Sequence, residues 1–143
     1  YKRQEIGSAQ RINMREGVEL LLDLPGQEVT VYTDSARLSQ VINNLVNNAI
    51  KFTSEGNIRI GYRPAASGYV NIFVEDTGTG MSREVLEHIF DRFYKGDSFK
   101  QGTGLGLSIC KTIVKRFEGK IEVTSTPGKG TCFTITLPLK VEE

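Results

Sequence analysis

The stretch Leu38 to Phe52, LSQVINNLVNNAIKF, decides the fold, because its apolar side chains recur at steps of three and four residues. This spacing predicts an amphipathic helix with one side buried in a core. The apolar side is formed by Leu38, Val41, Ile42, Leu45, Ala49 and Phe52. We expect Asp34 or Ser35 to cap the start of the helix, and Gly56 to end it in a left-handed conformation.

The other side of the same helix carries a row of amides. Asn44, Asn48 and Lys51 lie within about 60° of one another on a helix that turns by about 100° per residue. The four asparagines Asn43, Asn44, Asn47 and Asn48 lower the helix propensity of this stretch, by up to ~0.7 kcal/mol each relative to alanine. Amide oxygens can ligate a hard cation, while amide NH2 and ammonium groups donate to phosphate oxygens. The row therefore indicates a site for a polyanion and its metal.

Apolar and β-branched runs on both sides of this helix predict strands, joined in pairs by turns that contain glycine and proline. The predicted hairpins are Val18–Leu24 with Val29–Thr33, Asn57–Arg63 with Tyr69–Glu75, and Lys120–Thr126 with Thr131–Leu137. A short helix is predicted over Ser82–His88, with Ser82 as its cap. A second amphipathic helix is predicted from apolar residues spaced four apart and ended by Gly119; these are Leu105, Ile109, Ile113 and Phe117.

The order of these elements predicts an α+β domain in two layers, with a mixed, mostly antiparallel sheet covered on one face by about three helices. The 143 residues, 38% hydrophobic and 24% charged, suit one such domain. Residues 1–17 are polar and weakly patterned, so we expect a linker or the end of a preceding helix there, and the domain itself over 18–143.

Charge and cysteine content exclude several classes of protein. A net charge of +1 gives no long-range field, so neither nucleic acid nor an anionic membrane is expected as a partner. Cys110 and Cys132 are too few for a disulfide scaffold, which favours a reducing, cytoplasmic compartment. No apolar run approaches the ~20 residues of a membrane span, and no signal peptide is visible. Because the chain starts at Tyr1, we expect it to be a piece of a longer protein, and an inner-membrane sensor is compatible with that.

Two glycine-bearing stretches carry further chemistry. In VEDTGTGMS, a strand is predicted to stop at Asp76. The Asp76 carboxylate would lie beside glycine backbone and could accept a hydrogen bond from the exocyclic amine of a base. The alternative is an ordinary glycine-rich turn with an Asp for local hydrogen bonding. In GTGLGLS, glycines open the second amphipathic helix, where free backbone N–H groups make an anion site; a flexible hinge is the alternative. The spacing matches neither the dinucleotide fingerprint nor the P-loop.

In this order, the stretches resemble the ATP-binding catalytic domain of bacterial sensor histidine kinases, within the wider group (Bergerat-type fold) that includes gyrase, mismatch-repair and chaperone ATPases. NLVNNAIKF resembles the asparagine box of this family, DTGTG its first glycine box, IFDRFYKGD its phenylalanine box and GTGLGLSI its second glycine box. TSTPGKGTCFTITLP is similar to the final hairpin. The resemblance spans about Val18 to Pro138.

The resemblance implies a role for each matching residue. Asn48 would bind Mg²⁺, while Asn44 and Lys51 would lie at the phosphates of ATP, and these three form the expected catalytic set. Asp76 would recognise the adenine amine, supported by Thr131. The residues expected around the base are Phe52, Gly78, Gly80 and Met81, and those expected at the phosphate loop are Gly102, Thr103, Gly104, Leu105, Gly106 and Leu107.

The family also has a mobile lid, which would lie here between Phe93 and Gly102. Lys95 stands where arginine is frequent, and lysine cannot supply the bidentate fork of arginine. The phosphoaccepting histidine of the family lies on a separate dimerisation hairpin and is followed by an acidic residue. His88 is followed by Ile89 within the phenylalanine box, so we predict that His88 is not the phosphorylation site.

The activity implied is transfer of the gamma-phosphoryl group of ATP to a histidine on the phosphoacceptor domain of the same parent chain or its dimer partner. A response regulator would follow, and we expect the parent to be a homodimer and this piece a monomer without direct membrane contact. Three alternatives remain at this point. An ATP-hydrolysing motor would carry a glutamate where Asn44 stands, and a neutral amide is no general base. A serine kinase of the anti-sigma type shares the fold, and a degenerate module would only scaffold.

Overall fold

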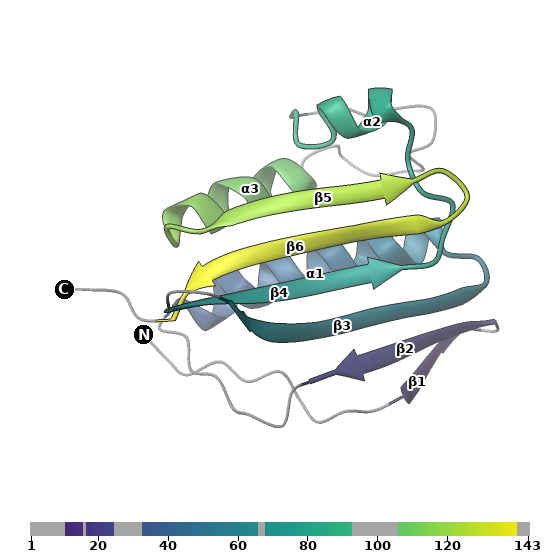
Figure 1. The fold of residues 1–143 in the computed structure, drawn as a ribbon, viewed down its shortest axis with the longest axis horizontal. Helices are drawn as coiled ribbons and strands as arrows, with labels where there is room; N and C mark the ends of the chain where they lie inside the picture. The colour runs from purple at the N-terminus through teal and green to yellow at the C-terminus, as the bar shows by residue number, and fades with distance from the viewer. Residues whose placement is uncertain (1–10, 16, 25–32, 66–67, 93–105, 140–143) are drawn as a thin grey trace.

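The computed structural model describes residues 11–15, 17–24, 33–65, 68–92 and 106–139. Six strands form a single sheet in the order β1-β2-β3-β4-β6-β5, and three helices accompany it (Figure 1). The elements are β1 (Arg11–Arg15), β2 (Val18–Asp23), α1 (Ser35–Phe52), β3 (Gly56–Ala65), β4 (Tyr69–Asp76), α2 (Arg83–His88), α3 (Gly106–Arg116), β5 (Lys120–Thr126) and β6 (Gly130–Pro138).

The sheet is mixed, with one parallel pair. β2 runs parallel to β3, and α1 forms the crossover between them, as a parallel pair requires. All other neighbours are antiparallel, including the predicted hairpins β3–β4 and β5–β6. The predicted hairpin of β2 with residues 29–33 is wrong, because both edges of β2 are hydrogen-bonded to β1 and β3. Residues 25–32 lie outside the described part of the chain.

Strand β1 is a finding that the sequence pattern did not predict. Arg11–Arg15 pair antiparallel with β2, with an irregularity in register between Asn13 and Arg15. The sheet thus starts earlier than the expected boundary after residue 17. Whether the residues before Arg11 form a linker or the end of a helix is not described, so that expectation stays a prediction.

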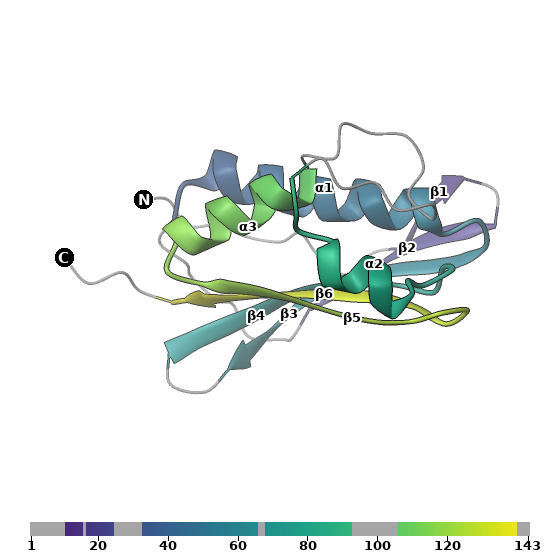
Figure 2. The same cartoon turned by 90° about the horizontal axis from the view of Figure 1, so that it is seen from above.

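Seen edge-on, α1 and α3 lie on the same face of the sheet (Figure 2). The short α2 lies beyond β5, at that edge of the sheet (Figure 1). Alternate residues of the central strands point toward α1 and α3 and are buried, among them Val74 and Phe133. The core therefore lies between the sheet and these two helices, in agreement with the predicted two-layer α+β sandwich.

Helix α1 forms as its sequence predicts. The Asp34 carboxylate caps it by accepting from the backbone N–H groups of Ala36 (3.0 Å) and Arg37 (3.2 Å). The predicted apolar side is buried or half-buried throughout, with Val41 and Leu45 fully covered. The helix ends at Phe52, because Thr53 is already extended. Gly56 does have a positive φ of 125°, but it begins β3 and does not cap the helix.

Helix α3 differs from its predicted pattern. It buries Leu107, Cys110, Ile113 and Val114, whereas Ile109 is 36% exposed. A spacing of four residues advances by about 40° per step, so the predicted row winds around the helix and cannot form one face. The residue with a left-handed backbone after the helix is Glu118 (φ 61°), not the predicted Gly119. Gly119 instead donates its N–H to the Val114 carbonyl at 3.0 Å.

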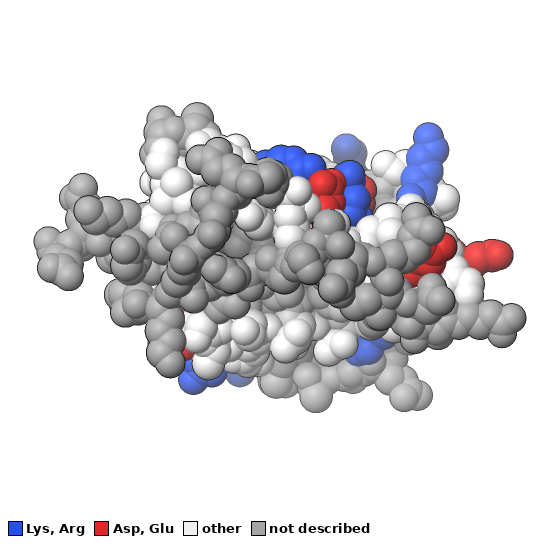
Figure 3. All heavy atoms as spheres, turned by 90° about the horizontal axis from the view of Figure 1, so that it is seen from below, with Lys and Arg blue, Asp and Glu red and all other residues white. Residues whose placement is uncertain are grey.

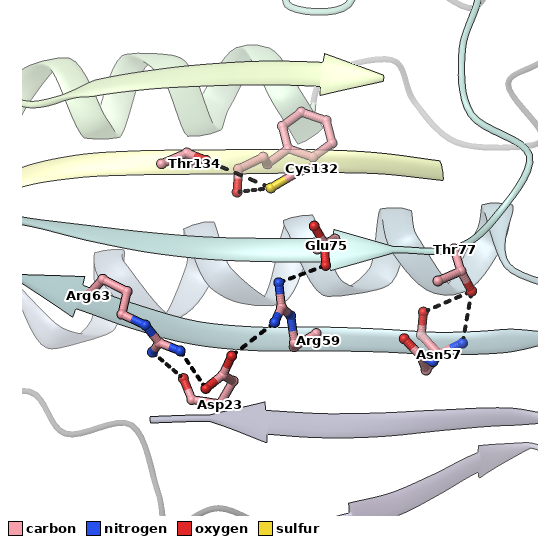
Figure 4. A network of polar contacts seen from close by, with 9 residues as sticks. Asp23, Asn57, Arg59, Arg63, Glu75, Thr77, Cys132 and Thr134 are labelled. Atoms are coloured by element: carbon pink, nitrogen blue, oxygen red, sulfur yellow. Dashed lines mark hydrogen bonds and ion pairs between the residues drawn. The ribbon is translucent and has the colours of Figure 1, made fainter. Parts of the chain in front are cut away.

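The face of the sheet opposite α1 and α3, here called the open face, carries a charged network (Figure 4). The Asp23 carboxylate contacts Arg63 Nη2 at 2.6 Å and Arg59 Nη1 at 3.1 Å, and Arg59 Nη2 reaches Glu75 Oε1 at 2.9 Å. Both guanidinium groups also lie over the Phe73 ring, with 5.2 and 5.8 Å to its centroid. The network ties β2, β3 and β4 together.

Charge is mixed in sign on the face of the molecule that Figure 3 shows. Viewed from the β1–β2 side, basic and acidic side chains lie beside one another along the upper border, without a broad patch of one sign among the described residues (Figure 3).

Both cysteines are free thiols. Within the described ranges, no helix is long and apolar enough to cross a membrane.

Candidate functional site

Asp76 is the last residue of β4 and points into the helix-covered side of the sheet. It is only 4% exposed. Its carboxylate accepts from the backbone N–H of Gly78 at 2.9 Å. Burial raises the pKa of the Asp76 carboxyl above 3.8, and the backbone N–H groups of Gly78 and Thr131 partly offset this. The protein thus maintains a desolvated acceptor here at a cost to its own stability, which is typical of functional sites.

The glycines after Asp76 have a packing role that the sequence did not predict, while their predicted role beside a flat ligand stays a prediction. A Cβ added at Gly78 would lie 2.1 Å from the Phe52 carbonyl oxygen, and one at Gly80, whose φ is +71°, would lie 2.1 Å from the Thr126 carbonyl oxygen. The predicted reason for glycine was space for a flat ligand. Here glycine is required because this loop packs tightly between the end of α1 and the β5–β6 turn. Two further hydrogen bonds fix the loop, from Thr79 N–H to the Phe52 carbonyl (3.0 Å) and from Gly128 N–H to the Thr79 carbonyl (2.7 Å).

Ser125 connects this loop to the strands, and the sequence did not single it out. The backbone N–H of Met81 donates to Ser125 Oγ at 2.8 Å. Ser125 Oγ also lies 2.9 Å from the Gly130 carbonyl oxygen and 2.8 Å from Thr131 Oγ1. Thr131 is 4% exposed and pairs directly with Asp76 across β4 and β6. The only sequence signal for Ser125 is its place on the inward side of β5, where the pattern otherwise favours apolar residues.

The amide row lies on α1 as predicted. Asn44 is half-buried, and its Nδ2 donates to the carbonyl of Gly106, the first residue of α3, at 3.4 Å. Asn48, one turn further, is 9% exposed. Its side-chain amide has no hydrogen-bond partner among the described residues. Asn43 and Asn47 are exposed, so only Asn44 and Asn48 are held against the rest of the domain.

The remaining predicted site residues are placed as follows. Lys51 is exposed in the last turn of α1, whereas Phe52 (6% exposed) and Met81 (2%) are buried beside the Asp76 loop. Leu107 is a core residue of α3 at 8% exposure. Six predicted residues lie outside the described part of the chain, namely Phe93, Lys95, Gly102, Thr103, Gly104 and Leu105, and so does the predicted lid.

Two other candidate nucleophiles, Cys110 and His88, have partners within the fold. Cys110 is fully buried, and burial raises the pKa of its thiol to about 11, so the thiol stays protonated. Its Sγ lies 3.7 Å from the Val41 carbonyl oxygen, where it packs α3 against α1. His88 ends α2, and its Nδ1 lies 2.8 Å from Asp91 Oδ2 in an exposed pair.

The site therefore has two parts joined by one helix. Asn44 of α1 lies near the start of α3. Phe52, eight residues or about 12 Å further along α1, lies near the end of β4. Residues 33–141, which include both parts, match the model of the histidine kinase-, DNA gyrase B- and HSP90-like ATPases. The chain belongs to this ATPase family. The recognition drawn from the sequence motifs is thereby confirmed.

Curated relatives of this chain include a sensory kinase and a sensor protein. The adaptive-response sensory kinase SasA of Crocosphaera subtropica is 42% identical over 127 residues, which cover 87% of this chain and 33% of that protein. The sensor protein SrrB of Staphylococcus aureus (strain MRSA252) is 42% identical over 127 residues, which cover 85% of this chain and 21% of that protein. The chain thus spans about a fifth to a third of the length of these relatives.

Solved structures with the same fold include the catalytic domain of a histidine kinase. Full-length ShkA in complex with AMPPNP superposes with a TM-score of 0.80 at 29% identity, over 88% of this chain and 26% of that one. The nucleotide-free catalytic domain of the histidine kinase ThkA gives a TM-score of 0.75 at 31% identity, over 86% of this chain and 81% of that one. The fold of this ATPase-family chain is therefore that of histidine kinase catalytic domains, as the sequence predicted.

A magnesium ion, which the sequence resemblance implied, fits the donors of this family member. Among the described residues no three or more His, Cys, Asp or Glu side chains gather into a metal cluster. Mg²⁺ does not need such a cluster, because it keeps several waters and binds nucleotide phosphates together with one or two protein oxygens. The mostly buried Asn48 amide, unused by the fold among the described residues, suits that single protein ligand.

Proposed function

We propose that this domain binds Mg-ATP and transfers its gamma-phosphoryl group to a histidine on the phosphoacceptor domain of a two-component sensor kinase. The observation that carries the proposal is the placement of α1, whose amide row lies at the start of α3 while its last residues contact the Asp76 loop. One helix thereby spans a site for phosphates and a site for a base. The family match and the sensor kinases among the relatives support the same conclusion.

At the base, Asp76 would accept from the adenine amine, with Thr131 beside it and Gly78, Gly80, Phe52 and Met81 around the ring. The carboxylate is already ordered by the Gly78 N–H, so little freedom is lost on binding. Its burial strengthens a hydrogen bond to a ligand, because the local dielectric is low. Asp76 is therefore the proposed adenine-recognising residue.

At the phosphates, Asn48 would hold Mg²⁺, which neutralises phosphate charge when bound. Asn44 and Lys51 would donate to phosphate oxygens, and the start of α3 at Gly106 and Leu107 would offer backbone N–H groups. We extend the proposal to the undescribed Gly102–Leu105, Phe93 and Lys95, on the sequence motifs alone. Phosphoryl transfer requires mainly positioning and charge neutralisation, and the accepting imidazole supplies its own lone pair. The domain needs no nucleophile.

The whole protein would then be a cytoplasmic kinase, or a membrane sensor with this domain in the cytoplasm, that acts as a homodimer and passes the phosphoryl group to a response regulator. Residues 18–143 would form the catalytic domain, with β1 added to its sheet. The relatives do not favour the serine kinase or the hydrolysing motor, and Asn44 stands where the motor needs a general base.

Titration calorimetry with ATP, with and without Mg²⁺, followed by a transfer assay tests the proposal. We expect magnesium-dependent binding, and transfer of label from gamma-labelled ATP to a separately supplied histidine-bearing phosphoacceptor domain of the parent. Asn48→Ala should lower transfer by roughly 100-fold, as for a misplaced reacting group, while Asn43→Ala, which changes an exposed amide on the same helix, should leave it unchanged. The domain alone should not become labelled at His88. Absence of ATP binding, or acid-labile label on His88, would overturn the proposal.

A further inference from the structure

Three polar residues form a row across neighbouring strands on the helix-covered side of the sheet. Ser125 of β5 pairs directly with Thr131 of β6, and Thr131 pairs directly with Asp76 of β4. Directly opposed residues in antiparallel strands project to the same side with their Cβ atoms about 5 Å apart. Thr131 therefore lies between the Asp76 carboxylate and the Ser125 hydroxyl.

The hydrogen bonds around Ser125 determine which atom donates to which. A hydroxyl has one proton and two lone pairs. Ser125 Oγ accepts from Met81 N–H at 2.8 Å, and it must donate to the Gly130 carbonyl oxygen at 2.9 Å, because that oxygen can only accept. The proton of Ser125 is then used. The 2.8 Å contact with Thr131 Oγ1 is a hydrogen bond only if Thr131 is the donor.

Thr131 Oγ1 has no proton left for a partner on the Asp76 side. With its own proton directed at Ser125, Thr131 Oγ1 has only lone pairs left for any further partner. The ionised Asp76 carboxylate is likewise an acceptor only. A ligand atom that contacted both groups would therefore meet only acceptors, which suits an amino group and disfavours a keto oxygen.

We propose that Ser125 is a specificity-determining positioning residue, which orients the Thr131 hydroxyl as an acceptor so that the site selects a 6-amino purine over a 6-oxo purine. Ser125 acts through Thr131 and through the Met81 backbone, without touching the base itself. This inference rests on the proposed binding of ATP with Asp76 at the base, and it adds the residue that sets the direction of the hydrogen bonds there.

Removing the Ser125 hydroxyl should free the Thr131 proton to donate to a keto oxygen. We expect Ser125→Ala to lower the ratio of ATP to ITP affinity by about tenfold, which is the size of one neutral hydrogen bond. Ser125→Thr, which keeps a hydroxyl, should restore the ratio of the unchanged protein. Thr124→Ala, an exposed neighbour on the other side of the same strand, is the matched control and should leave the ratio unchanged.

Affinities for ATP and ITP are measured by titration calorimetry on each variant, after thermal unfolding has shown that it folds. If Ser125→Ala weakens both nucleotides equally, Ser125 only supports the loop and the inference is wrong. If Ser125→Ala does not fold, Thr131→Val replaces it and must lower the same ratio, and an unchanged ratio would overturn the inference. A failure of the unchanged protein to bind ATP refutes the proposed function instead, so the two failures are distinguishable.

Discussion

The two parts of the site differ in how they are tied to the fold. At the base side, Asp76, Thr131 and Ser125 are joined to strands and turns by hydrogen bonds, and Gly78 has no room for a side chain. At the proposed phosphate side, the Asn48 amide has no hydrogen-bond partner among the described residues, and Asn44 Nδ2 donates to the Gly106 carbonyl at 3.4 Å. The side chains at the proposed base side are thus hydrogen-bonded within the fold, whereas at the proposed phosphate side the Asn48 amide has no such bond among the described residues.

This difference separates stability from activity. Changes at the base side should alter both folding and binding, because the same hydrogen bonds serve both. Changes at the phosphate side should alter activity with little effect on folding. Four predictions test this separation, from the largest expected effect to the smallest.

Asn48→Ala should affect activity alone. We expect phosphoryl transfer to fall by roughly 100-fold, as for a misplaced reacting group. The free energy of unfolding should stay within about 0.7 kcal/mol, because alanine favours the helix and the amide makes no bond among the described residues. Transfer kinetics and urea unfolding measure the two quantities. A loss of several kcal/mol in stability would contradict the separation.

Gly78→Ala should affect folding first. A Cβ at this position would lie 2.1 Å from the Phe52 carbonyl oxygen and 2.9 Å from Thr53 Oγ1, so the loop must move away from α1. We expect a loss of about 1–3 kcal/mol in unfolding free energy, as for overpacking, together with weaker ATP binding. Gly68→Ala is a control at a site where an added Cβ meets nothing within 4 Å, although its φ of +81° carries a backbone cost of its own. Equal melting temperatures for Gly78→Ala and the unchanged protein would contradict the packing argument.

Asp76→Asn should have opposite effects on binding and stability. ATP should bind more weakly by about 1–3 kcal/mol, because a charge-assisted hydrogen bond is lost. Burial raises the pKa of the Asp76 carboxyl, so the folded state of the unchanged protein loses stability as pH rises from 3.8 through that raised pKa. Asp76→Asn has no carboxyl to ionise at this position, so it does not lose stability in this way as pH rises.

Unfolding of the nucleotide-free proteins between pH 4 and pH 7 checks the second effect. We expect the stability of Asp76→Asn relative to the unchanged protein to increase over this range and then stay level. A relative stability that does not depend on pH would show that the pKa of Asp76 is not raised.

Asp23→Asn on the open face should have the smallest effect and none on nucleotides. The hydrogen bond from Arg63 holds the pKa of the Asp23 carboxyl below 3.8, so its contribution is present above that pH and is lost as pH falls through the folded-state pKa. Its side chain is 28% exposed, so we expect a loss of only about 0.5–1 kcal/mol near pH 7. Glu122→Gln, in the more exposed pair with Lys120, is the control and should change less. A change in ATP affinity on Asp23→Asn would contradict the independence of the two faces.

Sequence patterns predicted the local elements of this fold well and their pairing less well. Periodicity identified α1, its Asp34 cap and the hairpins β3–β4 and β5–β6, because each depends on neighbouring residues. It failed for β2, since an apolar run does not say which strand lies beside it. The buried face of α3 was misjudged because a strict four-residue spacing drifts around a helix.

For the site, motifs singled out residues whose placement the structure now describes, while their roles stay predictions. Asn48, Asp76 and Thr131 are buried polar groups, a property that composition alone does not reveal. The tight packing of Gly78 could not be foreseen, because its neighbour Phe52 is 26 residues away in the sequence. Ser125 escaped notice since a serine in a strand is ordinary, and only its three close partners distinguish it.

The order of strands also bears on how the domain can be isolated. The sheet has two edges, the five-residue β1 and the seven-residue β5, and β5 carries exposed Lys120 and Glu122, charges that oppose pairing with another chain. A shortened version that lacked β1 and β2 would expose the ten-residue β3, with its apolar Ile58 and Ile60, as a new edge. A version that starts after residue 24 is therefore expected to aggregate, while one that starts at Arg11 keeps β3 paired with β2.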